Sequence, residues 1–337
     1  MSIPVNYPLR FEPIFKERIW GGRRLESVLG KPLPPGKAIG ESWEISDHGQ
    51  DVSVIANGSQ RGRTLHDVLS ESGEHLLGNS LAAQRTRLGT VTPRFPVLVK
   101  WIDAHENLSI QVHPPDGHPR LPSGEAGKTE CWFVAAADPG AEIYLGLRRG
   151  IDRAALVHEL NRGTVDRCLN VFPAWPGDFF FVPAGTPHAI GAGVLLAEIQ
   201  QSSDTTFRFF DWNRVDPATG RPRDLQIEEA LDCILFRSEP PSKTNVATVP
   251  SNRVLTLLDY DLCPYFKVDW RRSTTSEKTG NPGRATTLIC LNGGGRLHGG
   301  GESVAFRAGD CALLPATGEY ICEPAPVCEF LQAEIGY

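Results

Sequence analysis

Residues 177–188 read Gly177-Asp-Phe-Phe-Phe-Val-Pro183-Ala-Gly-Thr-Pro-His188, and this stretch decides how the chain folds. A Gly-Asp turn opens it, an apolar run of strand type follows, and a histidine lies five positions after the proline. Residues 309–320, Gly309-Asp-Cys-Ala-Leu-Leu-Pro315-Ala-Thr-Gly-Glu-Tyr320, repeat the frame at the same spacing. Tyr320 takes the position of His188, so we predict one fold used twice, with the polar group missing from the second copy.

Short apolar runs bounded by turn residues surround both copies. The 34 glycines and 27 prolines are scattered between these runs, which is typical of an all-β protein. We predict strands over residues 95–102, 108–113, 131–134, 141–145, 178–182, 195–200, 287–291 and 311–314. Helical periodicity is weaker, and it predicts helices over residues 64–77, 152–169 and 225–233.

The frame Gly-x5-Pro-x-Gly-x2-His at the end of a hairpin resembles the second motif of the cupin family, whose double-sheet jelly roll holds a metal in its barrel mouth. We therefore predict an all-β fold with a few helices and two cupin-type jelly-roll units. A polar, proline-rich linker over residues 240–250 separates them. Residues 1–240 form the elaborated, catalytic, metal-binding unit in this prediction, and residues 250–337 form a smaller unit without a metal.

Composition excludes several classes of partner. The formal net charge is −6 and no Lys/Arg block occurs, which argues against nucleic-acid and anionic-membrane partners. No apolar run is long enough to span a bilayer, and residues 1–20 carry charges and prolines where a signal peptide needs an apolar stretch, so we predict a cytoplasmic protein. The eight cysteines contain no CxxC pair, which favours buried free thiols.

Four candidate metal ligands accompany the first frame. Gln111 and His113 alternate along one strand and so share a face. Glu130 begins the next apolar run, and His188 closes the frame described above. An isolated histidine at a strand end is usually a hydrogen-bonded structural residue, but four convergent donors favour a site for Zn²⁺ or another divalent first-row ion with room for water or substrate.

Six ordered segments make the resemblance specific. They are Ile19-Trp-Gly-Gly22, Gly40-Glu-Ser-Trp-Glu-Ile-Ser46, Leu108-Ser-Ile-Gln-Val-His-Pro114, Gly127-Lys-Thr-Glu-Cys-Trp132, Val182-Pro-Ala-Gly-Thr-Pro-His-Ala-Ile190 and Glu198-Ile-Gln-Gln-Ser-Ser-Asp-Thr-Thr-Phe-Arg208. Across nearly the whole chain they resemble the type I mannose-6-phosphate isomerases in their compact bacterial form. The resemblance implies a reversible, zinc-dependent interconversion of mannose 6-phosphate and fructose 6-phosphate, with one Zn²⁺ on Gln111, His113, Glu130 and His188.

Such an isomerase moves a proton between C1 and C2, so it needs a base and a group that stabilises charge on the sugar oxygens. Arg208 aligns with an arginine that the family places beside the sugar, and it could clamp phosphate or stabilise an enediolate. Lys128 shares a strand face with Glu130 and could relay the proton or bind phosphate. Glu198 is a rival base, and the Ser109 hydroxyl could meet the phosphate or simply hydrogen-bond within its strand.

Some positions depart from the family pattern. Phe207 stands where tyrosine is usual and Gln226 where histidine is often found, so we expect two polar contacts to be lost and substrate preference to be affected more than catalysis. We expect Trp175 and Trp212 to be core aromatics, and residues 293–301 to be a turn. A non-catalytic or other-sugar metal-binding cupin and a metal-dependent oxygenase remain alternatives, and monomer and homodimer are both open.

Overall fold

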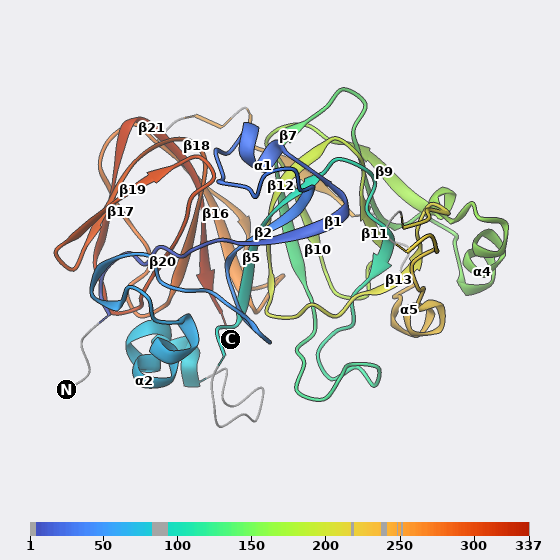
Figure 1. The fold of residues 1–337 in the computed structure, drawn as a ribbon, viewed down its shortest axis with the longest axis horizontal. Helices are drawn as coiled ribbons and strands as arrows, with labels where there is room; N and C mark the ends of the chain where they lie inside the picture. The colour runs from blue at the N-terminus through green and yellow to red at the C-terminus, as the bar shows by residue number, and fades with distance from the viewer. Residues whose placement is uncertain are drawn as a thin grey trace.

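The computed structural model describes residues 5–82, 94–216, 219–236, 241–247, 249–250 and 252–336. Two β units lie side by side, with the N-terminal strands crossing between them (Figure 1). Strands dominate and the helices are few, which confirms the predicted fold class.

The first unit consists of two antiparallel sheets that face each other. One sheet has the order β1 (Ile14–Gly22), β2 (Ile39–Ile45), β5 (Val97–Ala104), β12 (Val194–Gln201), β7 (Glu130–Ala137), β10 (Asp178–Val182), β14 (Lys243–Asn245). The other has the order β13 (Phe207–Phe210), β6 (Ile110–Val112), β11 (His188–Ile190), β8 (Glu142–Leu147), β9 (Leu169–Pro173). Alternate side chains of both sheets fill the space between them, among them the buried Trp132, Ile143 and Leu196.

Part of the predicted linker is a strand. Residues Lys243–Asn245 form β14, which pairs with β10 and so becomes the edge strand of that sheet. The Lys243 ammonium lies 2.7 Å from Asp178 Oδ2, and Asn245 Nδ2 donates to Asp178 Oδ1 over 2.8 Å. The linker therefore begins later than its composition indicates, and the division into residues 1–240 and 250–337 stays a prediction.

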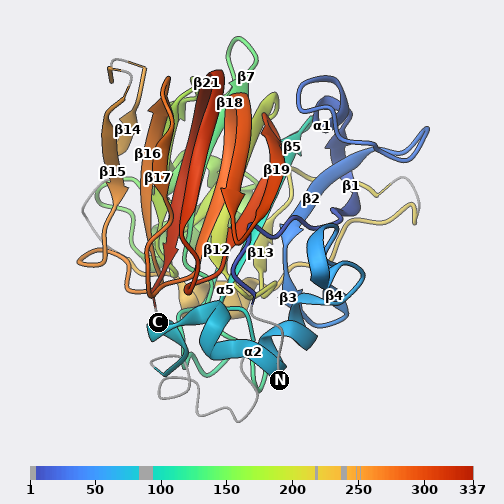
Figure 2. The same cartoon turned by 90° about the vertical axis from the view of Figure 1, so that its left-hand side faces the viewer.

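The second unit is built from β15 (Val254–Leu258), β16 (Phe266–Ser273), β17 (Glu277–Thr279), β18 (Thr286–Gly299), β19 (Glu302–Arg307), β20 (Cys311–Leu314) and β21 (Tyr320–Ile335). The strands β18 and β21 are 14 and 16 residues long, and their pairing shifts register along their length (Figure 2). Each therefore corresponds to two consecutive strands of the first unit. The predicted turn over residues 293–301 was wrong, because most of it continues β18. Glycine is needed there, since a Cβ on Gly295 would lie 2.0 Å from the Glu323 carbonyl oxygen.

Strand pairing confirms that the fold occurs twice. Val182 of β10 pairs with Glu130, and Leu314 of β20 pairs with Thr286 in the same way. In the first unit His188 pairs with Gln111, and in the second unit Tyr320 pairs with Thr279. Tyr320 therefore occupies the position of His188, as the repeated frame predicts.

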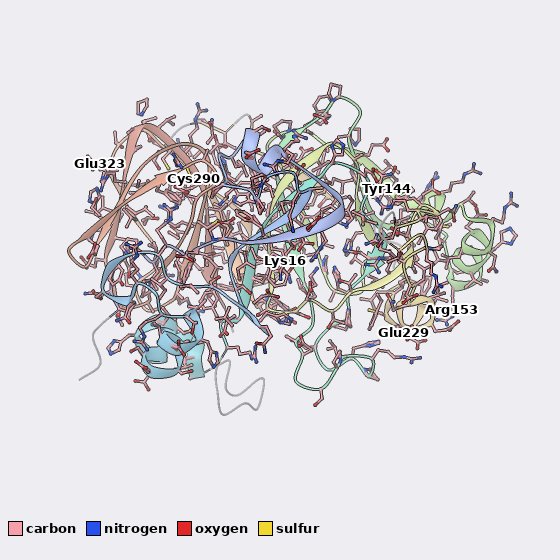
Figure 3. All side chains as sticks on the ribbon, in the orientation of Figure 1. Lys16, Tyr144, Arg153, Glu229, Cys290 and Glu323 are labelled. Atoms are coloured by element: carbon pink, nitrogen blue, oxygen red, sulfur yellow. The ribbon has the colours of Figure 1, made fainter. Side chains whose placement is uncertain are left out.

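The helices lie outside the sheets. α2 (Leu65–Leu77), with Thr64 as its N-cap, lies below the second unit, whereas α4 (Arg153–Arg162) and α5 (Ile227–Cys233) cover the far end of the first (Figure 1). Arg153 and Glu229 mark that end in Figure 3. The predicted helix over residues 152–169 stops early because Gly163 is left-handed, with a φ of 69°. The first unit also contains the short elements α1 (Arg24–Ser27), β3 (Asp47–His48) and β4 (Asp51–Val52), and the 3-10 helices η1 (Gly58–Gln60) and η2 (Val165–Cys168).

One hydrophobic cluster runs through both units. It includes Leu9, Leu77 and Trp101 from the first part of the chain and Leu313 and Leu331 from the second. Leu9 and Leu313 exchange two backbone hydrogen bonds of 2.8 and 2.9 Å. The two units therefore share a core.

Other side chains follow or depart from expectation. All eight cysteines are buried free thiols, as predicted.

The assignment of Trp175 to the core was wrong, because its side chain is 60% exposed. Trp175 lies in the turn before β10, where its backbone N–H donates to Asp178 Oδ2 over 2.9 Å. Trp212 is half-buried. Within the described ranges, no helix has the length and apolar character that a membrane crossing needs.

Candidate active site

Three predicted metal ligands converge between the two sheets of the first unit. His113 follows β6, Glu130 begins β7 and His188 begins β11, and all three are buried. Nε2 of His113 lies 3.5 Å from Glu130 Oε2, and Nε2 of His188 lies 3.4 Å from Glu130 Oε1. One potential ligand atom from each residue lies within 4.8 Å of the other two, so a single ion can reach all three.

Backbone carbonyls orient both imidazoles. His113 Nδ1 lies 3.0 Å from the Thr205 oxygen, and His188 Nδ1 lies 2.9 Å from the Thr186 oxygen. A carbonyl only accepts, so each Nδ1 carries the proton and each Nε2 keeps its lone pair. Burial, reinforced by the Lys128 ammonium, lowers both histidine pKa values, that of His188 to about 4. Both rings are therefore neutral at pH 7, the form that binds a metal.

The Glu130 carboxylate is also available to bind a metal. Among the described residues, neither of its oxygens finds a hydrogen-bond partner of normal geometry, although the carboxylate is fully buried. The Lys128 ammonium lies 2.8 Å from Oε2 and also 2.9 Å from His113 Nε2. Gln111, the fourth predicted ligand, places its amide nitrogen 3.3 Å from His188 Nε2. Two neutral imidazoles, a carboxylate and an adjacent amide make a donor set that suits a divalent first-row ion.

A cavity of about 490 Å³ adjoins this cluster. Gln111 and Lys128 form the part of its wall next to the metal ligands. Polar and charged side chains dominate the rest of the lining, which includes Arg18, Glu41, Lys100, Ser109, Glu198, Asp204, Thr206, Arg208, Arg223 and Gln226. The apolar lining residues are Trp20, Ile102, Leu108, Trp132 and Ile190. The cavity can therefore take a small, polar, negatively charged molecule.

Glu198 lies deep in this cavity. Its Oε2 accepts a hydrogen bond from Trp132 Nε1 over 2.9 Å, and Lys100 Nζ lies 3.4 Å from Oε1. Burial and the charge of Glu130 raise the pKa of Glu198. Burial alone would lower the pKa of Lys100, but the carboxylates of Glu198 and Glu41 outweigh it, so the net shift is upward.

Glu41 and its partners extend the charged network away from the cluster. Arg18 holds Glu41 with two hydrogen bonds of 3.1 Å, and burial of Glu41 is outweighed by Lys100 and Arg18, which lower its pKa to about 2. Residue types and spacing did not predict Arg18, Glu41 and Lys100 as part of the site. A lysine inside the apolar run 95–102 was the available signal, because a buried charge needs a partner.

Arg208 lies at the other side of the cavity. Its Nε donates to the Ser109 hydroxyl over 3.0 Å, and its Nη1 donates to the Asp224 carbonyl over 3.3 Å. Burial and the nearby Arg223 lower its pKa. Gln226 lines the same cavity, and its amide oxygen accepts from the Arg208 backbone N–H over 3.2 Å; the expected loss of the family's contact at this position stays a prediction.

All eight predicted site residues thus gather at one place: Ser109, Gln111, His113, Lys128, Glu130, His188, Glu198 and Arg208. The β6·β11 pairing explains this, since it sets His188 opposite Gln111, and β13 sets Arg208 opposite Gln111 from the other side.

A double-sheet fold with this donor set defines a cupin-type protein that has a candidate metal centre. Residues 9–138 match the family model described as the catalytic domain of type I phosphomannose isomerase. Mannose-6-phosphate isomerase ManA of Bacillus subtilis is 38% identical over 327 residues, which cover 95% of this chain and 97% of that protein. The chain belongs to the type I mannose-6-phosphate isomerase family.

Further relatives agree. Mannose-6-phosphate isomerase of Streptococcus mutans is 38% identical over 310 residues, covering 92% of this chain and 93% of that protein. Among solved structures, mannose 6-phosphate isomerase from Bacillus subtilis superposes with a TM-score of 0.80 at 30% identity, covering 97% of this chain and 99% of that one.

Proposed function

We propose that this protein is a metal-dependent aldose–ketose isomerase that interconverts mannose 6-phosphate and fructose 6-phosphate. The observation that carries the proposal is the buried His113, Glu130 and His188 cluster beside a charged cavity of about 490 Å³. Membership of a family whose relatives carry that name supports the choice of substrate.

The donor set supports a metal cofactor, which we propose to be one Zn²⁺ per chain on His113, Glu130 and His188, with Gln111 as the fourth ligand. When bound there, such an ion would supply Lewis-acid stabilisation of the charge that develops on the sugar oxygens. The hydrogen bonds from Nδ1 of both histidines to backbone carbonyls keep the imidazoles turned toward Glu130.

The proton transfer falls to Lys128 or Glu198. Lys128 Nζ reaches both His113 and Glu130, so an amine stands at the edge of the cluster. Glu198 has a raised pKa because of burial and Glu130, which makes its carboxylate a better proton acceptor than an exposed one. Both side chains line the cavity, so either can meet the carbon-bound proton of a bound sugar.

Arg208 and Ser109 serve substrate binding and charge stabilisation. The Arg208 guanidinium is held by Ser109 and Asp224, so its orientation is set before the substrate arrives. Arg18 and Arg223 line the same cavity and add positive charge. A phosphate or a developing oxyanion would be stabilised there.

The test is a coupled assay of purified protein with mannose 6-phosphate, before and after chelation and again after Zn²⁺ is restored. Activity that disappears with chelator and returns with Zn²⁺ is expected. A protein that binds Zn²⁺ but turns over no mannose 6-phosphate would contradict the proposal and favour the non-catalytic or other-sugar cupin. The same preparation gives the oligomeric state, for which monomer and homodimer are both proposed. Cytoplasmic localisation is proposed from the sequence.

A further inference from the structure

We propose that Asp116 and Tyr265 are positioning residues through which the second unit sets the geometry of the metal cluster in the first. The inference rests on the proposed function. Asp116 lies in the loop that leaves His113, whereas Tyr265 directly precedes β16 of the second unit. Neither side chain lines the cavity beside the cluster, so they act on the site through the residues they hold.

The Asp116 carboxylate joins three separate parts of the chain. Its Oδ1 accepts hydrogen bonds from the Gly127 backbone N–H over 2.6 Å and from Gln201 Nε2 over 3.1 Å. Its Oδ2 accepts from the Tyr265 hydroxyl over 3.0 Å. One side chain therefore ties the start of the loop to its end, to β12 and to the second unit.

The loop concerned runs from Pro114 to Thr129 and connects two metal ligands. It begins after His113 and ends before Glu130, with Lys128 near its end. The Lys128 backbone N–H donates to the Pro114 oxygen over 3.0 Å, so the two ends of the loop run side by side. Lys128 Nζ lies 2.9 Å from His113 Nε2. Any change in how the two ends of the loop meet would therefore move the Lys128 ammonium relative to the His113 ring.

Two features show that the two ends of this loop are held close together. A Cβ on Gly127 would lie 2.4 Å from the Asp116 backbone nitrogen, so only glycine allows the two ends to approach this closely. The second contact of Gln201 continues the network, because its Oε1 accepts from the Thr129 backbone N–H over 2.9 Å. Thr129 directly precedes Glu130. The Asp116 carboxylate is therefore connected to this metal ligand through the Gln201 side chain and the backbone of Thr129.

The second unit fixes Tyr265 firmly. The Tyr265 backbone oxygen accepts from the Gly336 N–H over 2.7 Å, which ties it to the end of β21. Its ring packs against the core shared by both units. The Tyr265 hydroxyl is therefore a fixed reference point in the second unit, and Asp116 transmits that position to the loop.

The variants that test this are Asp116→Ala, Asp116→Asn and Tyr265→Phe. The matched control is Tyr260→Phe, because the Tyr260 hydroxyl donates to backbone oxygens within the second unit, those of Glu334 over 3.4 Å and Ile335 over 3.5 Å. Each protein is measured for Zn²⁺ dissociation constant by competition with a chromophoric chelator, for kcat and KM with mannose 6-phosphate, and for Tm without metal.

Asp116→Ala should weaken Zn²⁺ binding and lower kcat by about 10-fold or more, as removal of an outer hydrogen-bond partner of a metal site does. KM should change by less than about 2-fold, because Ser109 and Arg208 are untouched. Asp116→Asn, which keeps the shape and an acceptor, should restore part of both losses. Tyr265→Phe should give a smaller loss in Zn²⁺ affinity, of about 3-fold, consistent with one hydrogen bond.

The inference is overturned if Asp116→Ala and Tyr265→Phe bind Zn²⁺ and turn over substrate like Tyr260→Phe, even if their Tm falls. Tyr265→Phe keeps the test decisive if Asp116→Ala does not fold. A wild-type protein without isomerase activity would refute the proposed function alone, and the order of the Zn²⁺ affinities would then still decide this inference.

Discussion

The two units place different side chains at the same positions of the same strand pairs. The first unit has Glu130 where the second has Thr286, and His188 where the second has Tyr320. On the neighbouring strands, Glu198 pairs with Lys100 in the first unit, whereas their counterparts Gln332 and Asp269 pair in the second.

At the corresponding positions of the second unit, polar side chains hydrogen-bond to one another. Thr279 Oγ1 donates to Gln332 Oε1 over 3.1 Å, and Asn281 Nδ2 donates to Glu334 Oε2 over 2.7 Å. The Tyr320 hydroxyl donates to the Pro315 carbonyl over 2.9 Å. In the first unit, by contrast, neither oxygen of the buried Glu130 makes a hydrogen bond of normal geometry among the described residues, and the carboxylate faces the Lys128 ammonium, which lies 2.8 Å from Oε2. Burying polar groups without hydrogen bonds costs stability, so the first unit retains for binding polar groups whose counterparts in the second unit serve packing.

The largest effect is expected from the metal ligands. Glu130→Gln keeps the shape but removes the charge, so it should lower activity by well over about 100-fold, more than outer-shell partners cost. Zn²⁺ content after dialysis should fall in parallel. Thr286→Val, at the equivalent position of the second unit, is the control and should keep both. Equal losses of activity and Zn²⁺ in the two variants would contradict the assignment of metal binding to the first unit alone.

Arg208→Ala should lower kcat by about 10²-fold, because it removes a preorganised charge beside the reacting oxygens. Zn²⁺ content and the shape of the pH–rate profile should stay unchanged, since arginine neither binds the metal nor titrates in the accessible range. Steady-state kinetics and metal analysis check this. An unchanged kcat with a raised KM would instead assign Arg208 to uniform binding of the phosphate.

Acid should destabilise the metal-free protein. The folded pKa of His188, about 4 because of burial and Lys128, lies below its unfolded value of about 6.5. The unfolded state then binds more protons between these values, so stability is present above pH 6.5 and is lost toward pH 4. From pH 7 to pH 5 the free energy of unfolding should fall by about 2 kcal/mol more in the wild type than in His188→Gln. Urea titrations of chelated protein measure this, and parallel curves would contradict it.

The smallest effect is expected in the second unit. Tyr320→Phe removes the buried hydrogen bond from the Tyr320 hydroxyl to the Pro315 carbonyl, and this loss should lower the free energy of unfolding by about 1 kcal/mol. Activity and Zn²⁺ content should remain those of the wild type. A loss of Zn²⁺ in this variant would show that the second copy still takes part in metal binding.

The sequence predicted the ligands because their signals are local. The alternation of Gln111 and His113 and the spacing of the frame around His188 can be read without knowing which strands are neighbours. Lys100 and Glu41 were missed because their roles depend on β2, β5 and β12 lying next to one another, which residue spacing does not reveal. Trp175 was misplaced because an aromatic residue in a turn looks like one in a strand until the turn is seen.

The hydrogen bonds between Leu9 and Leu313 also bear on synthesis. Ser80 follows the same scheme, since its hydroxyl donates to the Ile335 carbonyl over 2.9 Å. On the ribosome, residues 9 and 80 emerge long before their partners have been translated, so the early segments must wait for residues 313 and 335. Native structure in this part is therefore completed only once those residues have left the ribosome, and until then the early segments expose apolar surface that a chaperone would cover.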